Sequence, residues 1–300
     1  MKARFLTPAI TAFKEDGQLD MKANQQVYDH LIRGGIDGIV ILGSTGEFFN
    51  ISKDQQKELM DMAISYINHR TKVYVGTSFL SVEETIEMTN YAHRAGADAV
   101  MIISPYYFSL TEESIEAYYN EVAAATKAQI YLYNYPARTG YDLSPELTLR
   151  LLKKNRNIIG YKDTVTEMAH TRELIGLLLT EFPKFDILSG FDENFIHNVL
   201  SGGGGCIGGL SNLVPEVFSN MVKAVNEKNY EKMAASQKKV DQLMQFYAIG
   251  TPFIPIIKKA MMLRGINMED YCTKPFLRAD EKQIVKIKAL MNALNIEIVV

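Results

Sequence analysis

One lysine stands out as a candidate for chemistry, because it ends an otherwise apolar segment, NIIGYKDT at residues 157–164. Ile158 and Ile159 favour a buried strand, so Lys162 stands where an apolar side chain is expected. Burial disfavours the ammonium form of a lysine and favours the free amine. A free amine attacks a carbonyl compound to form a Schiff base, which then acts as an electron sink. The alternative is a lysine with a buried stem whose head reaches water or pairs with Asp163.

The segment GSTGE, residues 43–47, could bind an anion. It carries the hydroxyls of Ser44 and Thr45 in a glycine-bracketed turn, whose backbone N–H groups can converge on a carboxylate or a phosphate. It lacks the G-x-x-x-x-G-K-[ST] pattern of nucleotide-binding loops. The alternative is a simple turn in which Ser44 and Glu47 form a capping box.

The segment YNYPARTG supplies two further candidates, Tyr133 and Arg138. The phenol of Tyr133, in a stretch that reads as buried, could transfer protons to and from a reacting group. A core tyrosine bonded to a backbone carbonyl is the alternative. Arg138 could bind a carboxylate through two parallel hydrogen bonds, or it could be an ordinary surface arginine.

Other kinds of chemistry find little support. None of the five histidines share a metal-ligand spacing, so no metal site is predicted, and no G-x-S-x-G motif is present. The run SGGGGCIGG, residues 201–209, contains a formal G-x-G-x-x-G. Its glycines precede and permeate an apolar run and do not open a helix, so a tight approach to a strand is expected instead of a dinucleotide site.

The elements that must position these residues follow a regular pattern. Short, nearly continuous apolar runs alternate with helical patterns, as expected for parallel strands covered on both faces. Helix starts are marked by Ser52, Ser81 and Ser144, the last followed by Pro145 at the first helical position. We count eight βα units, which predict a (β/α)8 TIM barrel; a doubly wound sheet is the alternative. The apolar runs lie near residues 7, 41, 75, 102, 132, 160, 188 and 208.

From about Pro215 onward the pattern is helical only, whereas a barrel needs one helix after its eighth strand. We therefore predict a barrel over residues 1–225 and a C-terminal helical extension over residues 226–300. Active sites of such barrels lie at the carboxyl ends of the strands, which is where the candidate residues stand.

The composition suits a soluble cytoplasmic protein. The 300 residues are 47% hydrophobic and 22% charged, with a net charge of −3 and no basic stripe, so no nucleic-acid partner is expected. Two cysteines indicate no disulfide framework. No signal peptide is apparent, and no apolar run reaches the roughly 18 residues of a membrane span.

Four motifs together resemble a known family. GSTGE, SPYY, YNYPARTG and GYKDT, in this order and spacing, resemble the dihydrodipicolinate synthase/N-acetylneuraminate lyase family of pyruvate-dependent class I aldolases. GTPFIPIIKKAMMLRGI resembles the family's C-terminal helix motif, so the resemblance covers nearly the whole chain. It implies a barrel with a C-terminal helical extension, a homotetramer built from two tight dimers, and no cofactor besides the covalent Schiff base with pyruvate.

The resemblance also implies catalytic roles. Lys162 matches the Schiff-base lysine, and Tyr133 matches the tyrosine that relays protons during carbon–carbon bond making or breaking. Ser44 and Tyr107 match its hydroxyl relay partners, and Tyr107 is expected to reach across the tight dimer interface. Ser44 and Thr45 match the residues that hold the pyruvate carboxylate.

The substrate-binding positions point in two directions. Arg138 resembles the arginine with which the synthases bind aspartate semialdehyde, whereas Ser44 replaces their usual threonine. The segment GFDEN resembles the sugar-acid branches, although Gly209 replaces a serine that contacts the sugar in sialic acid lyases. The remaining positions implied to bind substrate are Thr164, Gly190, Asp192, Glu193 and, through its backbone, Ile207.

We therefore expect an aldolase that cleaves or forms a 2-keto-3-deoxy sugar acid from pyruvate and an aldehyde. NIIGYKDTVTEMAHTR together with TPFIPIIKKA looks most similar to 2-keto-3-deoxygluconate-type aldolases of this family. One alternative is 4-hydroxy-tetrahydrodipicolinate (dihydrodipicolinate) synthase of lysine biosynthesis. An alternative of another class is a non-catalytic sensor of a 2-keto acid.

Overall fold

Eight strands that close into a barrel in chain order, β1 to β8, form the centre of the protein in a computed structural model that describes residues 2–299. The predicted (β/α)8 fold is confirmed, and the doubly wound alternative is wrong. The strands are β1 Arg4–Pro8, β2 Gly38–Ile41, β3 Lys72–Gly76, β4 Ala99–Ile103, β5 Ile130–Asn134, β6 Ile158–Asp163, β7 Asp186–Ser189 and β8 Gly205–Ile207.

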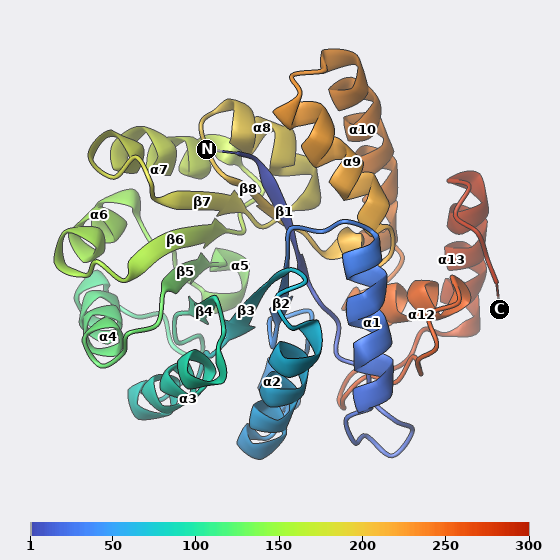
Figure 1. The fold of residues 1–300 in the computed structure, drawn as a ribbon, viewed down its shortest axis with the longest axis horizontal. Coiled ribbons are helices and arrows are strands. Elements are labelled where there is room, and N and C mark those ends of the chain that lie inside the picture. The colour runs from blue at the N-terminus through green and yellow to red at the C-terminus, as the bar shows by residue number, and fades with distance from the viewer. Residues whose placement is uncertain (1, 300) are drawn as a thin grey trace. The chain divides into compact units, whose positions relative to one another are not determined.

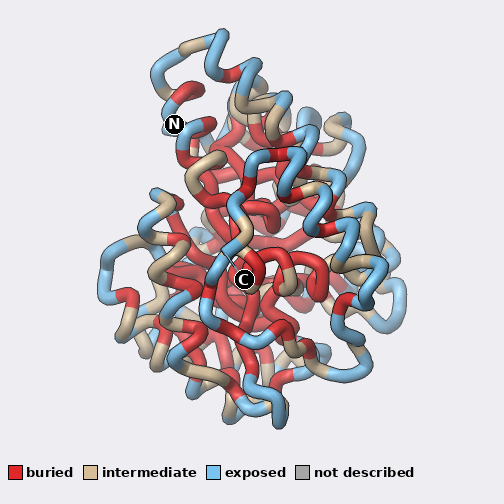
Figure 2. Tube along the Cα trace, turned by 90° about the vertical axis from the view of Figure 1, so that its right-hand side faces the viewer, coloured by how far each residue is buried: buried red, intermediate tan, exposed pale blue. Residues whose placement is uncertain are grey.

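The strands form where the sequence is apolar on both faces. Every residue of β2, β4, β5, β7 and β8 is buried. Figure 2 colours the buried residues of the chain red and the exposed ones pale blue. The approach to β8 is tight, as predicted from the glycine run: a Cβ on Gly205 would lie 1.9 Å from the carbonyl oxygen of Arg4. None of the helices in residues 2–299 is long and apolar enough to cross a membrane.

The predicted helix starts are confirmed. The Ser52 side chain accepts a hydrogen bond from the backbone N–H of Gln55 in a full capping box. Ser81 and Ser144 cap their helices in the same way, each accepting from the N–H three residues ahead. Each cap stabilises its helix by about 1 kcal/mol, so these polar residues fix where the chain leaves one layer for the next.

The chain divides into two compact units. The first unit comprises Met1–Arg4 and Val73–Ile207, and in it helices cover the outer side of strands β3 to β8 (Figure 1). Its helices are α3 Val82–Ala95, α4 Glu112–Ala124, α5 Pro136–Thr139, α6 Pro145–Lys154, α7 Met168–Glu181 and α8 Phe195–Leu200, with the 3-10 helix η2 Asp192–Asn194.

The second unit comprises Phe5–Lys72 and Gly208–Val300, so the C-terminal helices share a unit with α1 and α2. The predicted division between residues 225 and 226 stays a prediction. The helices of this unit are α1 Met21–Arg33, α2 Lys53–Ile67, α9 Pro215–Asn226, α10 Tyr230–Leu243, α11 Gln245–Ala248, α12 Ile254–Leu263 and α13 Glu281–Ala293, with the 3-10 helices η1 Phe48–Asn50 and η3 Gly209–Asn212.

A polar cluster occupies the amino ends of the strands in the first unit. Arg4 at the start of β1 forms an ion pair with Asp186 at the start of β7. The Tyr131 hydroxyl donates a 2.7 Å hydrogen bond to the same carboxylate. These groups bond to one another at the amino ends of the strands, whereas the reactive candidates lie towards the carboxyl ends.

Candidate active site

Lys162 and Tyr133 lie side by side on neighbouring strands. They are register partners on β6 and β5, so their side chains project from the same face of the sheet. The Lys162 side chain is buried, with 6% of the residue exposed, and its Nζ lies 4.0 Å from the centroid of the Tyr133 ring. The prediction of a buried strand that carries a buried lysine near its end is confirmed, and the strand itself ends one residue later, at Asp163.

The alternative interpretation of Lys162, a head in water or paired with Asp163, is wrong. Successive strand residues face opposite sides, so Asp163 points away from Lys162. The Asp163 carboxylate accepts hydrogen bonds from Asn134 Nδ2 at 3.0 Å and Thr171 Oγ1 at 2.6 Å. Within residues 2–299, no carboxylate forms an ion pair with Lys162. The amine is thus buried beside the aromatic ring of Tyr133.

His170 on α7 braces the outer face of the same strand. Its Nδ1 lies 3.0 Å from Asp163 Oδ2, and its Nε2 lies 3.2 Å from Asp142 Oδ2. Burial lowers the pKa of His170, but the hydrogen bond with Asp163 and the charges of both carboxylates outweigh burial and raise the pKa above its ordinary value. Sequence reasoning treated His170 only as a helical histidine and missed this contact between strand and helix.

Cys206 on β8 is a buried thiol whose pKa is affected by the charges of Lys162 and Asp192. Its Sγ donates a hydrogen bond to the Phe191 carbonyl. Burial and the charge of Asp192 raise the pKa of the thiol well above its ordinary value, and the charge of Lys162 acts in the opposite direction. Cys206 therefore stays protonated, which makes the thiol a poor nucleophile. Asp192, a predicted substrate-binding residue, is itself buried, with 1% of the residue exposed.

Thr164 presents a buried hydroxyl that has no protein partner. Within residues 2–299, no group forms a hydrogen bond with Thr164 Oγ1. Gly190 makes this arrangement possible, since a Cβ there would lie 2.0 Å from Thr164 Oγ1. A buried hydroxyl without a partner is costly, so it marks a place where a ligand can supply the missing hydrogen bond.

A cavity of about 380 Å³ is lined by Thr164 and, in part, by aromatic side chains. Tyr135 and Phe191 line it, with ring centroids 6.4 Å apart, and Tyr133 stacks on Tyr135 at 6.1 Å. Arg138 on α5 is exposed, and its guanidinium carbon lies 5.3 Å from the centroid of the Tyr135 ring. Arg138 is therefore held against an aromatic residue of the cavity wall.

The remaining candidates of the first unit differ in exposure. Tyr107, in the loop after β4, is 80% exposed and packs edge-on against Phe108, which is also exposed. Ile207 is buried at the end of β8, and Glu193 is half-buried in η2. Their predicted roles stay predictions.

The 43–47 turn belongs to the second unit, directly after β2. Thr45 is buried and Ser44 is half-buried. Glu47 does not form the capping box offered as the alternative for this segment. Its carboxylate instead forms an ion pair with Lys258 on α12 and accepts hydrogen bonds from Thr273. Sequence reasoning missed Lys258, although a lysine inside the apolar run IPIIKKAMML is the same kind of signal as Lys162.

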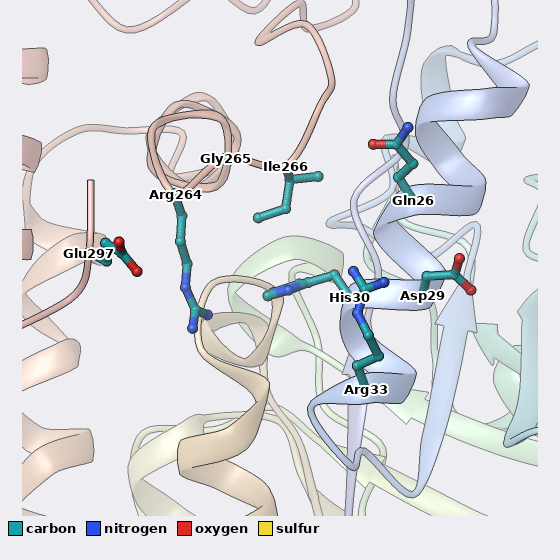
Figure 3. Close-up of a pocket in the computed structure, with 8 residues that line it drawn as sticks. All are labelled: Gln26, Asp29, His30, Arg33, Arg264, Gly265, Ile266 and Glu297. Carbon is teal, nitrogen blue, oxygen red and sulfur yellow. The ribbon is translucent and has the colours of Figure 1, made fainter. Parts of the chain in front are cut away.

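A second cavity, of about 400 Å³, lies in the second unit beside α1 and the end of α12 (Figure 3). Two of its basic side chains already have partners: Arg264 pairs with Glu216, and His30 Nε2 donates to the Asn212 carbonyl. Burial, helped by the charge of Arg264, lowers the pKa of His30 to about 4, so the imidazole is neutral at pH 7. This cavity offers no nucleophile, and we do not assign the active site to it.

No group of three or more histidine, cysteine, aspartate or glutamate side chains in residues 2–299 is arranged to hold a metal ion.

The chain matches the dihydrodipicolinate synthetase family over residues 1–294. The protein belongs to this family. The resemblance seen in four short motifs is thereby confirmed over almost the whole chain, and the protein is an enzyme of the carbon–carbon lyase class.

Three relatives within the dihydrodipicolinate synthetase family bear on the substrate. YagE of Escherichia coli, named as a candidate 2-dehydro-3-deoxy-D-gluconate aldolase, is 35% identical over 97% of this chain and 96% of its own length. YjhH of the same organism, named as a candidate 2-dehydro-3-deoxy-D-pentonate aldolase, is 34% identical over 97% of each chain. A 4-hydroxy-tetrahydrodipicolinate synthase of Kosmotoga olearia is 34% identical over 87% of each chain.

The fold of the family member YagE is nearly the same. Its crystal structure in complex with pyruvate superposes with a TM-score of 0.95 and covers 98% of this chain and 99% of its own.

Proposed function

We propose that this protein is a pyruvate-dependent class I aldolase that cleaves or forms a 2-keto-3-deoxy sugar acid. The observation that carries the proposal is the buried amine of Lys162, held 4.0 Å from the centroid of the Tyr133 ring without a carboxylate partner in residues 2–299. A lysine used only for structure would be paired or would reach water. The names of the relatives YagE and YjhH support the same substrate class.

The reaction follows from the properties of that amine. In the direction of synthesis, Lys162 Nζ attacks the keto carbon of pyruvate, and loss of water gives an iminium. The iminium draws electrons from the methyl carbon, which loses a proton to give an enamine. The enamine carbon attacks the aldehyde, and hydrolysis frees the product and the lysine. Cleavage is the reverse sequence.

Tyr133 is proposed as the proton carrier. Its phenol lies on the strand next to Lys162, in register with it, so it is suited to reach groups bonded to the lysine nitrogen. It would donate a proton to the departing hydroxyl of the carbinolamine and take one back during hydrolysis. Replacing Tyr133 therefore should slow the chemical steps more than the binding of pyruvate.

The carboxylate and the relay partners are proposed from the family resemblance. Ser44 and Thr45 would hold the pyruvate carboxylate with hydroxyl and backbone N–H groups, and the backbone of Ile207 would line the pyruvate pocket. Ser44 and Tyr107 would complete the proton relay. The high exposure of Tyr107 and Phe108 supports a subunit contact there, and we propose a homotetramer composed of two tight dimers.

The sugar part of the substrate is proposed to contact Thr164, Gly190, Asp192 and Glu193. The buried Thr164 hydroxyl without a partner, beside a cavity of about 380 Å³, supports this assignment. We also propose a cytoplasmic location, which suits two cysteines that are free and buried.

The test is a substrate panel read by pyruvate release. We expect cleavage of 2-keto-3-deoxygluconate or a 2-keto-3-deoxypentonate by the wild type. Thr164→Val should raise KM for the sugar acid by about 2- to 10-fold, because one hydrogen bond to the substrate is lost, and should keep or raise the stability, because a buried hydroxyl without a partner is removed. Failure to release pyruvate from any 2-keto-3-deoxy acid would remove this proposal.

The second candidate is 4-hydroxy-tetrahydrodipicolinate synthase, which Arg138 and the Kosmotoga olearia relative favour. An arginine near the cavity wall could bind the carboxylate of aspartate semialdehyde. If this candidate is right, the protein condenses pyruvate with aspartate semialdehyde, and Arg138→Ala loses that activity. If the aldolase is right, Arg138→Ala has little effect on cleavage of a sugar acid whose far end is uncharged.

A further inference from the structure

The second unit contains a fully buried ion pair that the proposed chemistry does not use. Lys258 on α12 and Glu47 at the end of the 43–47 turn are each 0% exposed, and Lys258 Nζ donates to Glu47 Oε1. The same ammonium donates a 2.8 Å hydrogen bond to the Tyr271 carbonyl and lies 4.7 Å from the centroid of the Phe13 ring. Two charges are thus removed from water, although a buried ion pair often stabilises a protein no more than well-packed apolar side chains would.

The second oxygen of Glu47 is also fully used. Glu47 Oε2 accepts 2.7 Å hydrogen bonds from both the backbone N–H and the Oγ1 of Thr273. The carboxylate therefore binds three donors, one from α12 and two from the segment that follows it. Charge-assisted hydrogen bonds of this kind are strong and directional, so they fix the position of the residue that accepts them.

What these bonds hold is the backbone that carries Ser44 and Thr45. Two non-glycine residues lie in the left-handed region here: Leu42, directly before the turn, at φ 54°, and Glu47, its last residue, at φ 58°. Such residues are uncommon and persist where the surroundings fix them. A hydrogen bond of 2.8 Å from Thr11 Oγ1 to the Gly46 carbonyl holds the middle of the turn, and the Glu47 side chain holds its end.

We propose that Lys258, Glu47 and Thr273 are positioning residues that fix the 43–47 turn in the shape needed to bind a substrate carboxylate. This inference rests on the proposed function, because that function gives the turn its ligand. It assigns part of carboxylate recognition to the C-terminal helices, which the sequence suggested to be an appendage. A packing role alone would change stability without changing the preference for a carboxylate.

The experiment traps the Schiff base at Lys162 with borohydride and measures the ketone concentration that gives half-maximal trapping. Two probes are compared: pyruvate, and acetone, which lacks the carboxylate. The main variant is the double substitution Glu47→Gln/Lys258→Met, which removes both buried charges together. Thr273→Val is a milder variant that keeps the ion pair. Lys259→Met is the matched control, since Lys259 lies on the same helix and pairs with Asp270 instead.

We expect the half-saturating pyruvate concentration to rise about 10- to 100-fold in the double variant, because binding groups displaced by a fraction of an ångström lose most of their effect. Thr273→Val should shift it in the same direction by a smaller factor. Acetone trapping should stay within about twofold of wild type in every variant, and Lys259→Met should behave as wild type with both probes.

Unchanged pyruvate saturation in Thr273→Val and in the double variant would overturn the inference, as would equal losses for pyruvate and acetone. Thr273→Val keeps the test decisive if the double variant folds poorly. Absence of any pyruvate adduct in the wild type would overturn the proposed function itself. Trapping in the wild type with no carboxylate-selective effect in the variants would overturn the inference alone.

Discussion

The protein buries two lysines, Lys162 and Lys258, in very different surroundings. Lys258 is 0% exposed and binds a carboxylate and a carbonyl, so its charge is matched and its nitrogen is occupied. Lys162 is 6% exposed and has the ring of Tyr133 beside it, with no ion pair in the part of the chain that the structure describes. We infer from this difference that burial alone does not make a lysine a reagent, and that the proposed role of Lys162 also depends on its nitrogen not being held by a carboxylate.

The largest effect is expected from Lys162→Met. Removing the nucleophile should lower kcat/KM for pyruvate release by at least about 10⁴-fold. Stability should be kept or raised, because an apolar side chain of similar length replaces a buried amine. Steady-state kinetics and the thermal midpoint measure the two effects. A variant within tenfold of the wild-type rate would mean that Lys162 resembles Lys258 in being structural.

The next largest effect is expected from Tyr133→Phe, which tests the role of the hydroxyl beside Lys162. The ring beside Lys162 is kept and only the hydroxyl is lost, so the pyruvate adduct should still form, but more slowly. Turnover should fall by about 10²–10⁴-fold, because general acid–base catalysis is removed. Single-turnover kinetics separate the two steps. A normal rate in Tyr133→Phe would make the tyrosine a packing residue.

Lys258→Met tests the structural lysine. It leaves the Glu47 carboxylate buried without its cation, which should lower the free energy of unfolding by about 3–5 kcal/mol. The double substitution Glu47→Gln/Lys258→Met should recover much of that loss. Urea unfolding of both variants, with Lys259→Met as control, measures this. Equal stability of Lys258→Met and the wild type would contradict the account of a matched buried pair.

The smallest effect concerns His170, which pairs with Asp163, the residue after Lys162. The pKa of His170 is raised above its ordinary value of 6.5 in the folded protein, so its stabilising contribution is present below that value. The contribution is lost as the pH rises through the folded-state pKa. His170→Gln should therefore be destabilised at acid pH and approach wild type as the pH rises. Urea unfolding across this range measures the difference; a pH-independent difference would contradict it.

The two lysines also show how far the sequence could predict the structure. The eight strands and the helix starts follow from apolar runs and capping residues, which act over a few positions. Lys162 was visible because it interrupts such a run. Lys258 interrupts one too, in α12, and the same reasoning would have made it a second nucleophile. Its partner Glu47 lies 211 residues away, so only the fold reveals that this lysine is paired.

The Thr164 hydroxyl was beyond sequence reasoning for a similar reason. A threonine is usually satisfied by a nearby carbonyl, and nothing local shows that this one is not. The Thr164 hydroxyl can occupy this position because Gly190, directly after β7, has no side chain to exclude it. The family resemblance named both residues without giving this physical cause.

The most direct test of the central claim is to reduce the wild-type protein with borohydride in the presence of pyruvate and to map the modified peptide by mass spectrometry. The account predicts one reduced pyruvyl adduct, on Lys162, with Lys258 unmodified and no adduct in Lys162→Met. No adduct, or an adduct on a different lysine, would contradict it.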